Sequence, residues 1–304
     1  MTSVRPVAKG NDRRVIVRLT SNGIFNRQSH RSVNGRGIGR WIRCGYRIYP
    51  TVIQCCRVKW MNPRASTNEA YTPTYIEHLA NVITHGIWVV PSLLGGLELV
   101  KRSLTWTQLV SAWVYGTSLL LVFAVSTFFH SVHYYTIKKN FINCRQLKDV
   151  LHRCDRAMIY VFIAATYFPW LMIEDCPDNI WLPMMRYIVW IMATLGILYQ
   201  QVFHERYKML ETIFYLVMGI GPSVAVISNK FDNIGELKTG GLIYIVGIVF
   251  FKSDGRIPCA HAIWHLFVAG GAGFHYYAIL RSGITYLPDP EPQYRLVPTF
   301  FRVN

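Results

Sequence analysis

The chain has 304 residues, of which 52% are hydrophobic, 14% aromatic and only 16% charged. This composition is too apolar and too poorly charged for an average soluble domain, so it favours a membrane protein. The formal net charge of +16 does not indicate a nucleic-acid partner, because residues 1–66 carry +13 of it and the rest of the chain is nearly neutral at +3.

Residues 1–66 are rich in Arg, Gly, Ser and Asn and contain one acidic residue, Asp12. We expect them to form a disordered cytoplasmic tail. Their composition also resembles a mitochondrial transit peptide, whereas arginines interrupt every stretch that could serve as a secretory signal. A third interpretation is that translation starts at Met61, which opens the more typical polar segment "MNPRASTNEAYTPTYIEH". Residues 282–304 are expected to form a short C-terminal tail.

The body of the chain, residues 67–281, contains seven apolar stretches. A membrane-spanning helix needs about 20 apolar residues to cross about 30 Å of hydrocarbon. No series of alternating ten-residue strands indicates a barrel, so we predict an all-α, seven-helix membrane bundle. The predicted spans are 78–100, 108–132, 155–174, 180–202, 208–229, 238–252 and 260–281, and the sixth is the shortest.

The orientation of the bundle follows from the Lys and Arg residues in its short loops, which favour the cytoplasmic side. If the basic tail is cytoplasmic, the loops on that side carry nine basic residues and the opposite loops carry four. The sequence therefore predicts a cytoplasmic N-terminus and an outside or lumenal C-terminus. The nine are Lys138, Lys139, Arg145, Lys148, Arg153, Arg206, Lys208, Lys252 and Arg256; the four are Lys101, Arg102, Lys230 and Lys238.

Ionisable side chains gather near the cytoplasmic ends of three spans. Ionisable residues inside spans are costly and usually mark functional sites. Ser126 and His130 lie four residues apart near the end of span two, Asp155 begins span three, and His261 and His265 lie four apart at the start of span seven. Residues four apart share one face of a helix. The three helices therefore deliver these five residues to one depth.

Three histidines at one depth match the ligand set of a tetrahedral zinc ion that keeps its fourth position open for water. We predict that His130, His261 and His265 bind Zn2+, with Asp155 and Ser126 supporting the ligands or the water. The alternative is that they are interfacial residues without a metal. A separation above about 8 Å between the side chains of His130 and His261 would exclude shared coordination at zinc–nitrogen distances of about 2 Å.

Other polar residues receive structural interpretations. Glu77, Asn81 and His85 form a stripe at i, i+4 and i+8 of span one, which favours a structural network over direct catalysis. Gly219 and Gly221, before Pro222, are expected to permit close packing or a kink. Four histidines have no polar neighbours in the pattern and are expected to be interfacial or packing residues: His133, His152, His204 and His275.

These residues carry a resemblance to a known family. The combination of "EHLANVITHG", Ser126 to His130 as SxxxH, "HRCDRAMIY" and "FFKSDGRIPCAHAIWHLFV" resembles the progestin and adipoQ receptor (PAQR) and hemolysin III family. Within it the similarity is closest to the monocyte-to-macrophage differentiation factor group and spans about residues 58–281. The resemblance implies a cytoplasmic N-terminus, seven helices and zinc held by His130, His261 and His265.

The resemblance also frames the function. It implies a receptor-like or signalling role, with the lipid bilayer and cytoplasmic signalling proteins as partners. The alternative is a zinc-dependent lipid amidohydrolase acting on a substrate such as ceramide, in which Asp155 takes the proton and Ser126 helps to hold the oxyanion. A cytolytic pore is disfavoured, since no polar stripe runs through several spans. The expected location is an endomembrane (Golgi, late endosome or lysosome) or the plasma membrane.

Overall fold

The computed structural model describes residues 59–66, 69–139, 145–172, 181–204, 206–228 and 234–283. All of them lie in the unit Val58–Asn304, which is separate from Met1–Arg57. The predicted N-terminal tail before residue 59 and the predicted C-terminal tail after residue 283 lie outside the described residues.

Seven α-helices follow one another along the described residues, and no strand occurs among them. Each predicted span corresponds to one helix, and the sixth helix is the shortest, as predicted. At 18 to 34 residues, the helices are about 27 to 51 Å long. The helices are α3 (Tyr75–Arg102), α4 (Trp106–Lys139), α5 (Arg145–Leu171), α6 (Trp181–Val202), α7 (Lys208–Ser228), α8 (Ile234–Phe251) and α9 (Ala260–Ala278), and a π-helical turn, η2 (Ile279–Gly283), follows α9.

The largest error in the predicted boundaries concerns α5. This helix begins at Arg145, ten residues before the predicted span, so Lys148 and Arg153 lie on a helix and not in a loop. Likewise, Lys138 and Lys139 belong to α4. The length of an apolar stretch shows only which part of a helix can lie in the hydrocarbon core of a membrane. The backbone hydrogen bonds of the helix can continue through polar residues beyond that part.

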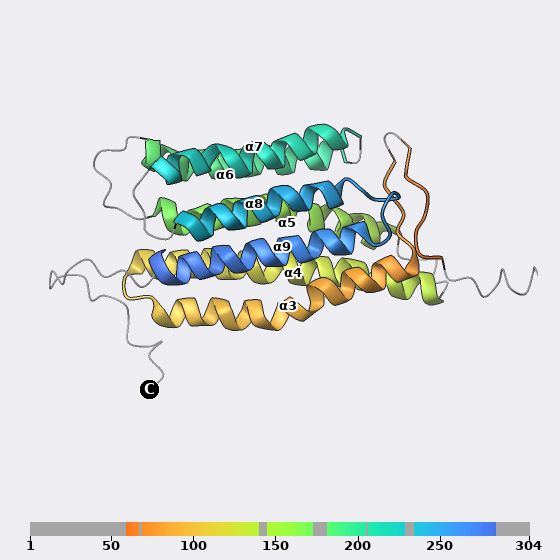
Figure 1. Cartoon of the computed structure of the whole chain (residues 1–304), viewed down its shortest axis with the longest axis horizontal. Coiled ribbons are helices and arrows are strands. Elements are labelled where there is room, and N and C mark those ends of the chain that lie inside the picture. Colours follow the sequence, from red (N-terminus) through yellow and green to blue (C-terminus); the bar gives the residue numbers. More distant parts are fainter. Residues whose placement is uncertain are drawn as a thin grey trace, which may run out of the picture. The chain divides into compact units, whose positions relative to one another are not determined.

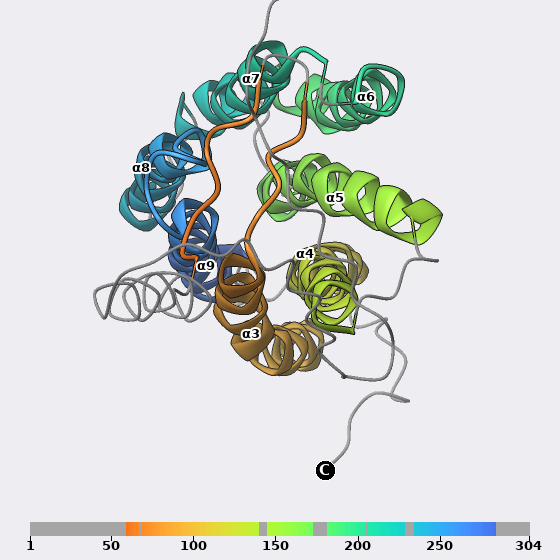
Figure 2. The same ribbon diagram turned by 90° about the vertical axis from the view of Figure 1, so that its right-hand side faces the viewer.

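The helices form a ring, seen end-on in Figure 2. Helices adjacent in the sequence contact one another, and α9 packs against α3 to close the ring. Because the helices alternate in direction, the first turns of α3, α5, α7 and α9 meet the last turns of α4, α6 and α8 at one end, on the right in Figure 1. We call this the proximal end and the opposite one the distal end.

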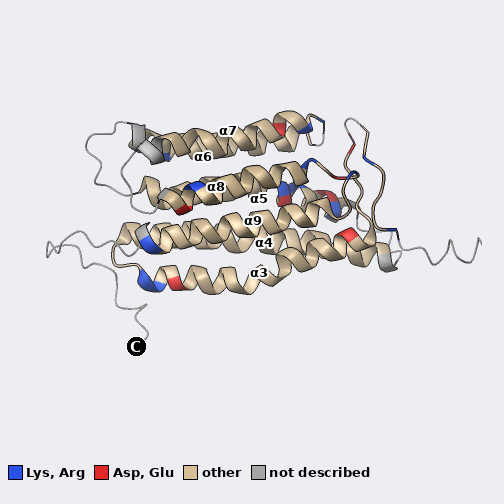
Figure 3. Cartoon of the chain, in the orientation of Figure 1, with Lys and Arg blue, Asp and Glu red and all other residues tan. Residues whose placement is uncertain are grey.

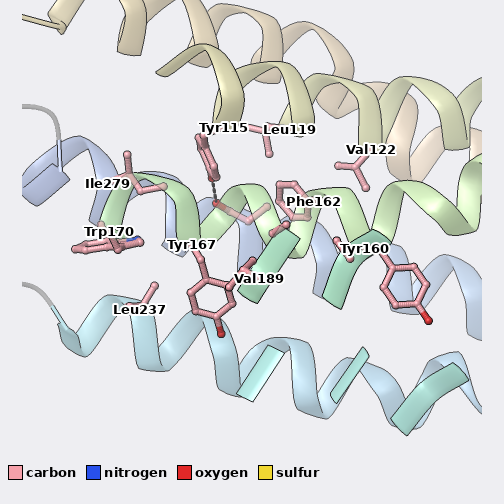
Figure 4. Packing of buried hydrophobic residues seen from close by; sticks show 14 of the residues in the cluster. Tyr115, Leu119, Val122, Tyr160, Phe162, Tyr167, Trp170, Val189, Leu237 and Ile279 are labelled. Carbon is pink, nitrogen blue, oxygen red and sulfur yellow. Dashed lines mark hydrogen bonds between the residues drawn. The ribbon is translucent and has the colours of Figure 1, made fainter. Parts of the chain in front are cut away.

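Large aromatic side chains fill the interior of the distal half. Tyr115 of α4, Tyr160 and Trp170 of α5 are fully buried, and Figure 4 shows them among aliphatic residues of neighbouring helices. The Tyr115 hydroxyl donates a hydrogen bond to the Ala272 carbonyl of α9 over 3.4 Å. Such contacts bind the helices to one another, which fixes the relative positions of α4, α5 and α9.

The outer surface of the ring is apolar. Exposed residues along the helices include Ile87, Val90, Leu195 and Val224, each more than half exposed. Figure 3 shows that charged residues gather near the two ends and leave the middle of the helices uncharged. Two helices are long and apolar enough to cross a membrane by length and composition: α3, and the stretch Trp106–Ile137 of α4. The predicted seven-span topology and its orientation stay predictions.

Close helix packing occurs between α3 and α4 and not at the glycines that the sequence suggested. A Cβ atom on Gly116 would lie 2.9 Å from the Cα atom of Gly96, so the two backbones touch. By contrast, a Cβ atom on Gly219 or Gly221 of α7 would meet no described atom within 4 Å. The expected close packing is therefore not found at these two glycines among the described residues, and the alternative, a kink, stays a prediction.

A segment before α3 runs across the proximal end, as Figure 2 shows in orange. We call residues 59–66 and 69–74 the N-terminal strap. The Asn62 amide donates to the Thr72 carbonyl over 2.7 Å, and Lys208 of α7 donates to the Glu69 carbonyl. Gly255, in the α8–α9 loop at φ 73°, lies so close to the backbone of Arg64 that a Cβ atom there would clash. The strap thus contacts the loop that leads into α9.

Candidate metal centre

Three histidines from two helices converge near the proximal end. His130 lies on α4, and His261 and His265 lie one turn apart on α9. One ligand atom from each lies within 4.8 Å of those of the other two. The ring centroid of His130 is 5.6 Å from that of His261 and 5.4 Å from that of His265. The separation is well below the 8 Å that would have excluded shared coordination.

The local structure explains how α9 presents two of these side chains. The loop after α8 turns at Gly255, and Cys259 begins α9 in the left-handed region, at φ 54° and ψ 29°. His261 therefore stands in the first turn, with 23% of its side chain exposed, whereas His265 is one turn deeper and 2% exposed. Burial raises the pKa of the Cys259 thiol.

The donor atoms present fit a metal ion. The Nε2 atom of His130 is buried without a hydrogen-bond partner among the described residues, which is costly for an imidazole unless something else binds it. Three imidazole nitrogens at this spacing match the ligand set of a zinc site that keeps a fourth position open. In the part of the chain that the structure describes, no other group of three or more His, Cys, Asp or Glu side chains converges in this way. These three histidines can hold a metal ion.

Each candidate ligand has a polar neighbour at its other ring nitrogen. His130 Nδ1 is 3.1 Å from His78 Nδ1, and His265 Nδ1 is 3.1 Å from the Thr84 hydroxyl. On the exposed side, His261 Nδ1 is 3.8 Å from an Asp254 carboxylate oxygen in the α8–α9 loop. Partners at the second nitrogen orient a metal-binding histidine and fix its tautomer.

Asp155 and Ser126 lie beside the three histidines. The Asp155 carboxyl, on α5, faces the Ser126 hydroxyl of α4 and is close enough to His261 to interact electrostatically. Ser126 is 2% exposed, four residues before His130 on α4. The structure thus brings all five predicted residues together, while the roles assigned to Asp155 and Ser126 stay predictions.

The comparisons with known proteins show the family of the chain. The family model "Haemolysin-III related" matches residues 74–276, which include every helix that carries the centre. The chain belongs to this haemolysin-III family. Monocyte to macrophage differentiation factor of Homo sapiens is 46% identical over 224 residues, covering 73% of this chain and 91% of that protein. Hemolysin-3 of Bacillus cereus is 34% identical over 212 residues, covering 67% of this chain and 90% of that protein.

A third relative, the hemolysin-3 homolog of Bacillus subtilis strain 168, is 35% identical over 216 residues, covering 68% of this chain and 94% of that protein. The resemblance to the PAQR and hemolysin III family is therefore confirmed, and this chain is a membrane protein of that family. The compartment in which it resides stays a prediction.

The polar residues Glu77, Asn81 and His85 of α3 have two roles: Glu77 caps the helix, and the other two contact the candidate ligands. Glu77 forms a capping box with Thr74: the Thr74 side chain accepts from the Glu77 N–H over 3.2 Å, and the Glu77 carboxylate accepts from the Thr74 N–H over 2.7 Å. The Tyr71 hydroxyl also donates to Glu77 over 3.0 Å, and burial raises the pKa of Tyr71, which keeps this donor protonated. Asn81 and His85 lie deeper, against His130 and His265.

Sequence reasoning missed two contributors on the same helix. His78 and Thr84 contact the candidate ligands directly, yet the i, i+4 pattern that selected Asn81 passes over both. Residues three apart also share a helix face, so the spacing of His78, Asn81 and Thr84 could have predicted that all three face the candidate ligands.

Three of the four remaining histidines, for which an interfacial or packing role is expected, have neighbours that the sequence pattern did not indicate. The rings of His78 and His133 stack with centroids 4.9 Å apart. His152 Nδ1 lies 3.2 Å from His204 Nε2, which joins α5 to the segment after α6. These contacts cross between helices, so spacing along one helix does not reveal them. His275 is buried in the distal half, and its ring lies 5.4 Å from that of Tyr244, in keeping with the packing role predicted for it.

Proposed function

We propose that this chain is a seven-span membrane protein that binds zinc through His130, His261 and His265 and has a receptor-like or signalling role. The observation that supports zinc is the convergence of three imidazole nitrogens within 4.8 Å, two of them on buried side chains. Histidine nitrogen is a preferred zinc donor, and a site that joins α4 to α9 ties distant parts of the ring together.

The signalling role is supported by a relative. The differentiation factor of Homo sapiens is 46% identical, and the aligned region covers 91% of it. The proposed orientation places the proximal end in the cytoplasm, because the basic loop residues predicted for that side favour it. The metal centre would then lie near the inner leaflet, where a metal-dependent change in the packing of α4 and α9 could reach cytoplasmic partners.

A second candidate function is hydrolysis of a lipid amide such as ceramide. Two observations favour it. Three protein ligands would leave the fourth coordination position of a zinc ion open, and the carboxyl group of Asp155 lies beside His261. Zinc in such a site polarises a carbonyl group and lowers the pKa of water. In this proposal Asp155 accepts the proton of the attacking water and passes it to the leaving amine. The Ser126 hydroxyl, which is buried without a hydrogen-bond partner among the described residues, helps to hold the oxyanion.

Metal analysis of the purified full chain beside His265→Ala tests the zinc proposal, with a ceramide-release assay on the same samples. The matched control is His275→Ala, which removes a buried histidine from the same helix outside the ligand group. We expect about one zinc ion per chain in the wild type and in the control, and a loss of at least tenfold in zinc affinity for His265→Ala.

The outcomes separate the candidates. Full zinc occupancy in His265→Ala would show that the assigned ligands are wrong. Zinc together with ceramide release that is lost in Asp155→Asn would favour the hydrolase. Zinc without turnover of ceramide or related lipid amides would favour the signalling protein.

A further inference from the structure

One face of α3 meets the back of the candidate metal centre. His78, Asn81 and Thr84 follow one another at intervals of three residues, so they lie on one side of the helix. His78 Nδ1 and Asn81 Nδ2 lie 3.1 Å and 3.4 Å from His130 Nδ1. The Thr84 hydroxyl lies 3.1 Å from Nδ1 of His265. Each of these contacts therefore reaches Nδ1 and leaves the other ring nitrogen, Nε2, free of them.

These contacts indicate which ring nitrogen of His130 is available to bind a metal. A neutral imidazole carries one N–H, and a metal takes the lone pair of the other nitrogen. His130 Nε2 is buried without a partner among the described residues, whereas Nδ1 has His78 beside it. His130 thus binds a metal through Nε2 only if Nδ1 carries the proton. In that state the lone pair of His78 Nδ1 is the acceptor for that proton. The Asn81 amide suits the same state when it is turned by 180°, because its Oδ1, which has no other partner among the described residues, then replaces the donor Nδ2 beside His130 Nδ1.

We propose that His78 is a positioning residue that accepts the Nδ1–H of His130 and thereby holds His130 in the tautomer that binds zinc through Nε2. The inference rests on the zinc site proposed above. If His78 instead donated to His130, the proton of His130 would sit on Nε2 and block coordination. The usual partner of a metal-binding histidine is a carboxylate, a carbonyl group or water. Here a second neutral imidazole fills that place.

The surroundings of His78 suit a fixed acceptor. Its side chain is 1% exposed, so water cannot readily substitute for it. The ring of His133 stacks on it with centroids 4.9 Å apart and planes inclined by 24°, which restrains its rotation. The His130 ring is 5.3 Å away and inclined by 50° to that of His78. An ordered acceptor of this kind raises metal affinity by orienting its partner before the metal arrives.

The test compares zinc affinity of full-length variants by chelator competition and their visible spectra after loading with Co2+. His78→Asn keeps an acceptor, since the amide oxygen takes about the position of Nδ1, and should stay within about threefold of the wild type. His78→Gln and His78→Leu lack an acceptor at that position and should bind zinc about 10- to 100-fold more weakly. His133→Phe is the matched control, because it keeps a ring stacked on His78 without touching a ligand, and it should bind zinc as the wild type does.

Every result bears on the proposal. If the wild type binds no zinc, the metal centre itself is wrong, and this inference falls with it. If the wild type binds zinc and His78→Gln binds it equally well, the inference is overturned while the metal centre stands. If His78→Asn loses zinc as fully as His78→Leu and the Co2+ spectrum changes, His78 is a ligand and not a positioning residue. His78→Asn and His78→Gln differ by only one methylene group, so their zinc affinities can be compared directly. The proposal can therefore still be tested if His78→Leu fails to fold.

Discussion

The ring of His85 lies flat against the ring of His265, with centroids 3.5 Å apart and planes inclined by 13°. His85 is 4% exposed, and its Nδ1 and Nε2 atoms have no hydrogen-bond partner among the described residues. Phe123 of α4 also meets the His85 ring edge-on, with centroids 5.1 Å apart. The stack therefore restrains the ring plane of a candidate zinc ligand through packing alone.

From this stack we expect His85→Phe to keep zinc affinity within about threefold of the wild type, because it retains a flat ring against His265. Stability in detergent should stay equal or rise by about 1 kcal/mol, since two buried polar atoms without partners disappear. His85→Ala should lower stability by about 2 to 4 kcal/mol through the cavity that it leaves. Thermal unfolding with zinc titration measures both. A large loss of zinc in His85→Phe would show that the ring nitrogens matter.

The sequence was sufficient to predict which three histidines converge. His261 and His265 share a helix face by spacing, and the depth of His130 in an oppositely directed span placed it at the same level. These arguments need only helix geometry and the order of the spans. The boundaries of the apolar stretches likewise predicted each helix to within a few residues, except where polar residues extend the end of α4 to Lys139 and the start of α5 to Arg145.

The contacts around the ligands could not be predicted in this way. His78 meets His130 because α3 packs beside α4, and His152 meets His204 because the first turns of α5 lie beside the segment after α6. The rotation of each helix about its own axis decides such pairs. That rotation is set by the packing of large side chains such as Tyr115 and Trp170, which spacing along one helix does not encode.

Metal removal should destabilise the bundle. A ligand that binds only the folded chain stabilises it by about 2.7 kcal/mol when its free concentration is 100 times the dissociation constant. We therefore expect a strong chelator to lower the melting temperature of the full chain, and added zinc to restore it. The shift should be absent in His261→Ala, which lacks one candidate ligand. A chelator effect of equal size in that variant would mean that the stabilising metal binds elsewhere.

An ion pair between α5 and α7 offers a prediction away from the metal. Arg156 Nη1 lies 2.7 Å from Glu211 Oε2, with the two side chains 17% and 6% exposed, and the Tyr215 hydroxyl donates to the other carboxylate oxygen over 3.0 Å. Arg156→Met leaves the carboxylate buried without its cation and should cost about 3 to 5 kcal/mol. Chemical or thermal unfolding of the variant in detergent measures the loss.

Two further variants test the cause of that loss. Arg156→Met combined with Glu211→Gln removes both charges, retains an acceptor for Tyr215, and should recover most of the stability. Arg102→Met breaks the Arg102–Glu98 pair, whose side chains are 46% and 38% exposed, and should cost less than about 1 kcal/mol. A double variant as unstable as Arg156→Met alone would assign the loss to the packing of the Arg156 side chain.

The contact between Gly96 and Gly116 gives the sharpest packing test. A methyl group on Gly116 would lie 2.9 Å from the Cα atom of Gly96, and because that atom is backbone, α3 and α4 must move apart to accept it. We expect Gly116→Ala to lower the stability of the bundle by about 1 to 3 kcal/mol. Because His78 and His130 lie on these two helices, the displacement should also weaken zinc binding.

Gly219→Ala is the matched control for Gly116→Ala, because its methyl group would meet no described atom within 4 Å. Alanine is a better helix former than glycine by about 1 kcal/mol, so this variant should unfold at the same or a slightly higher temperature. Melting curves and zinc titrations of both variants test whether the α3–α4 approach matters specifically. If the two substitutions lowered stability equally, the loss would come from the backbone and not from the clash, and the close approach would have no special role in holding α3 against His130.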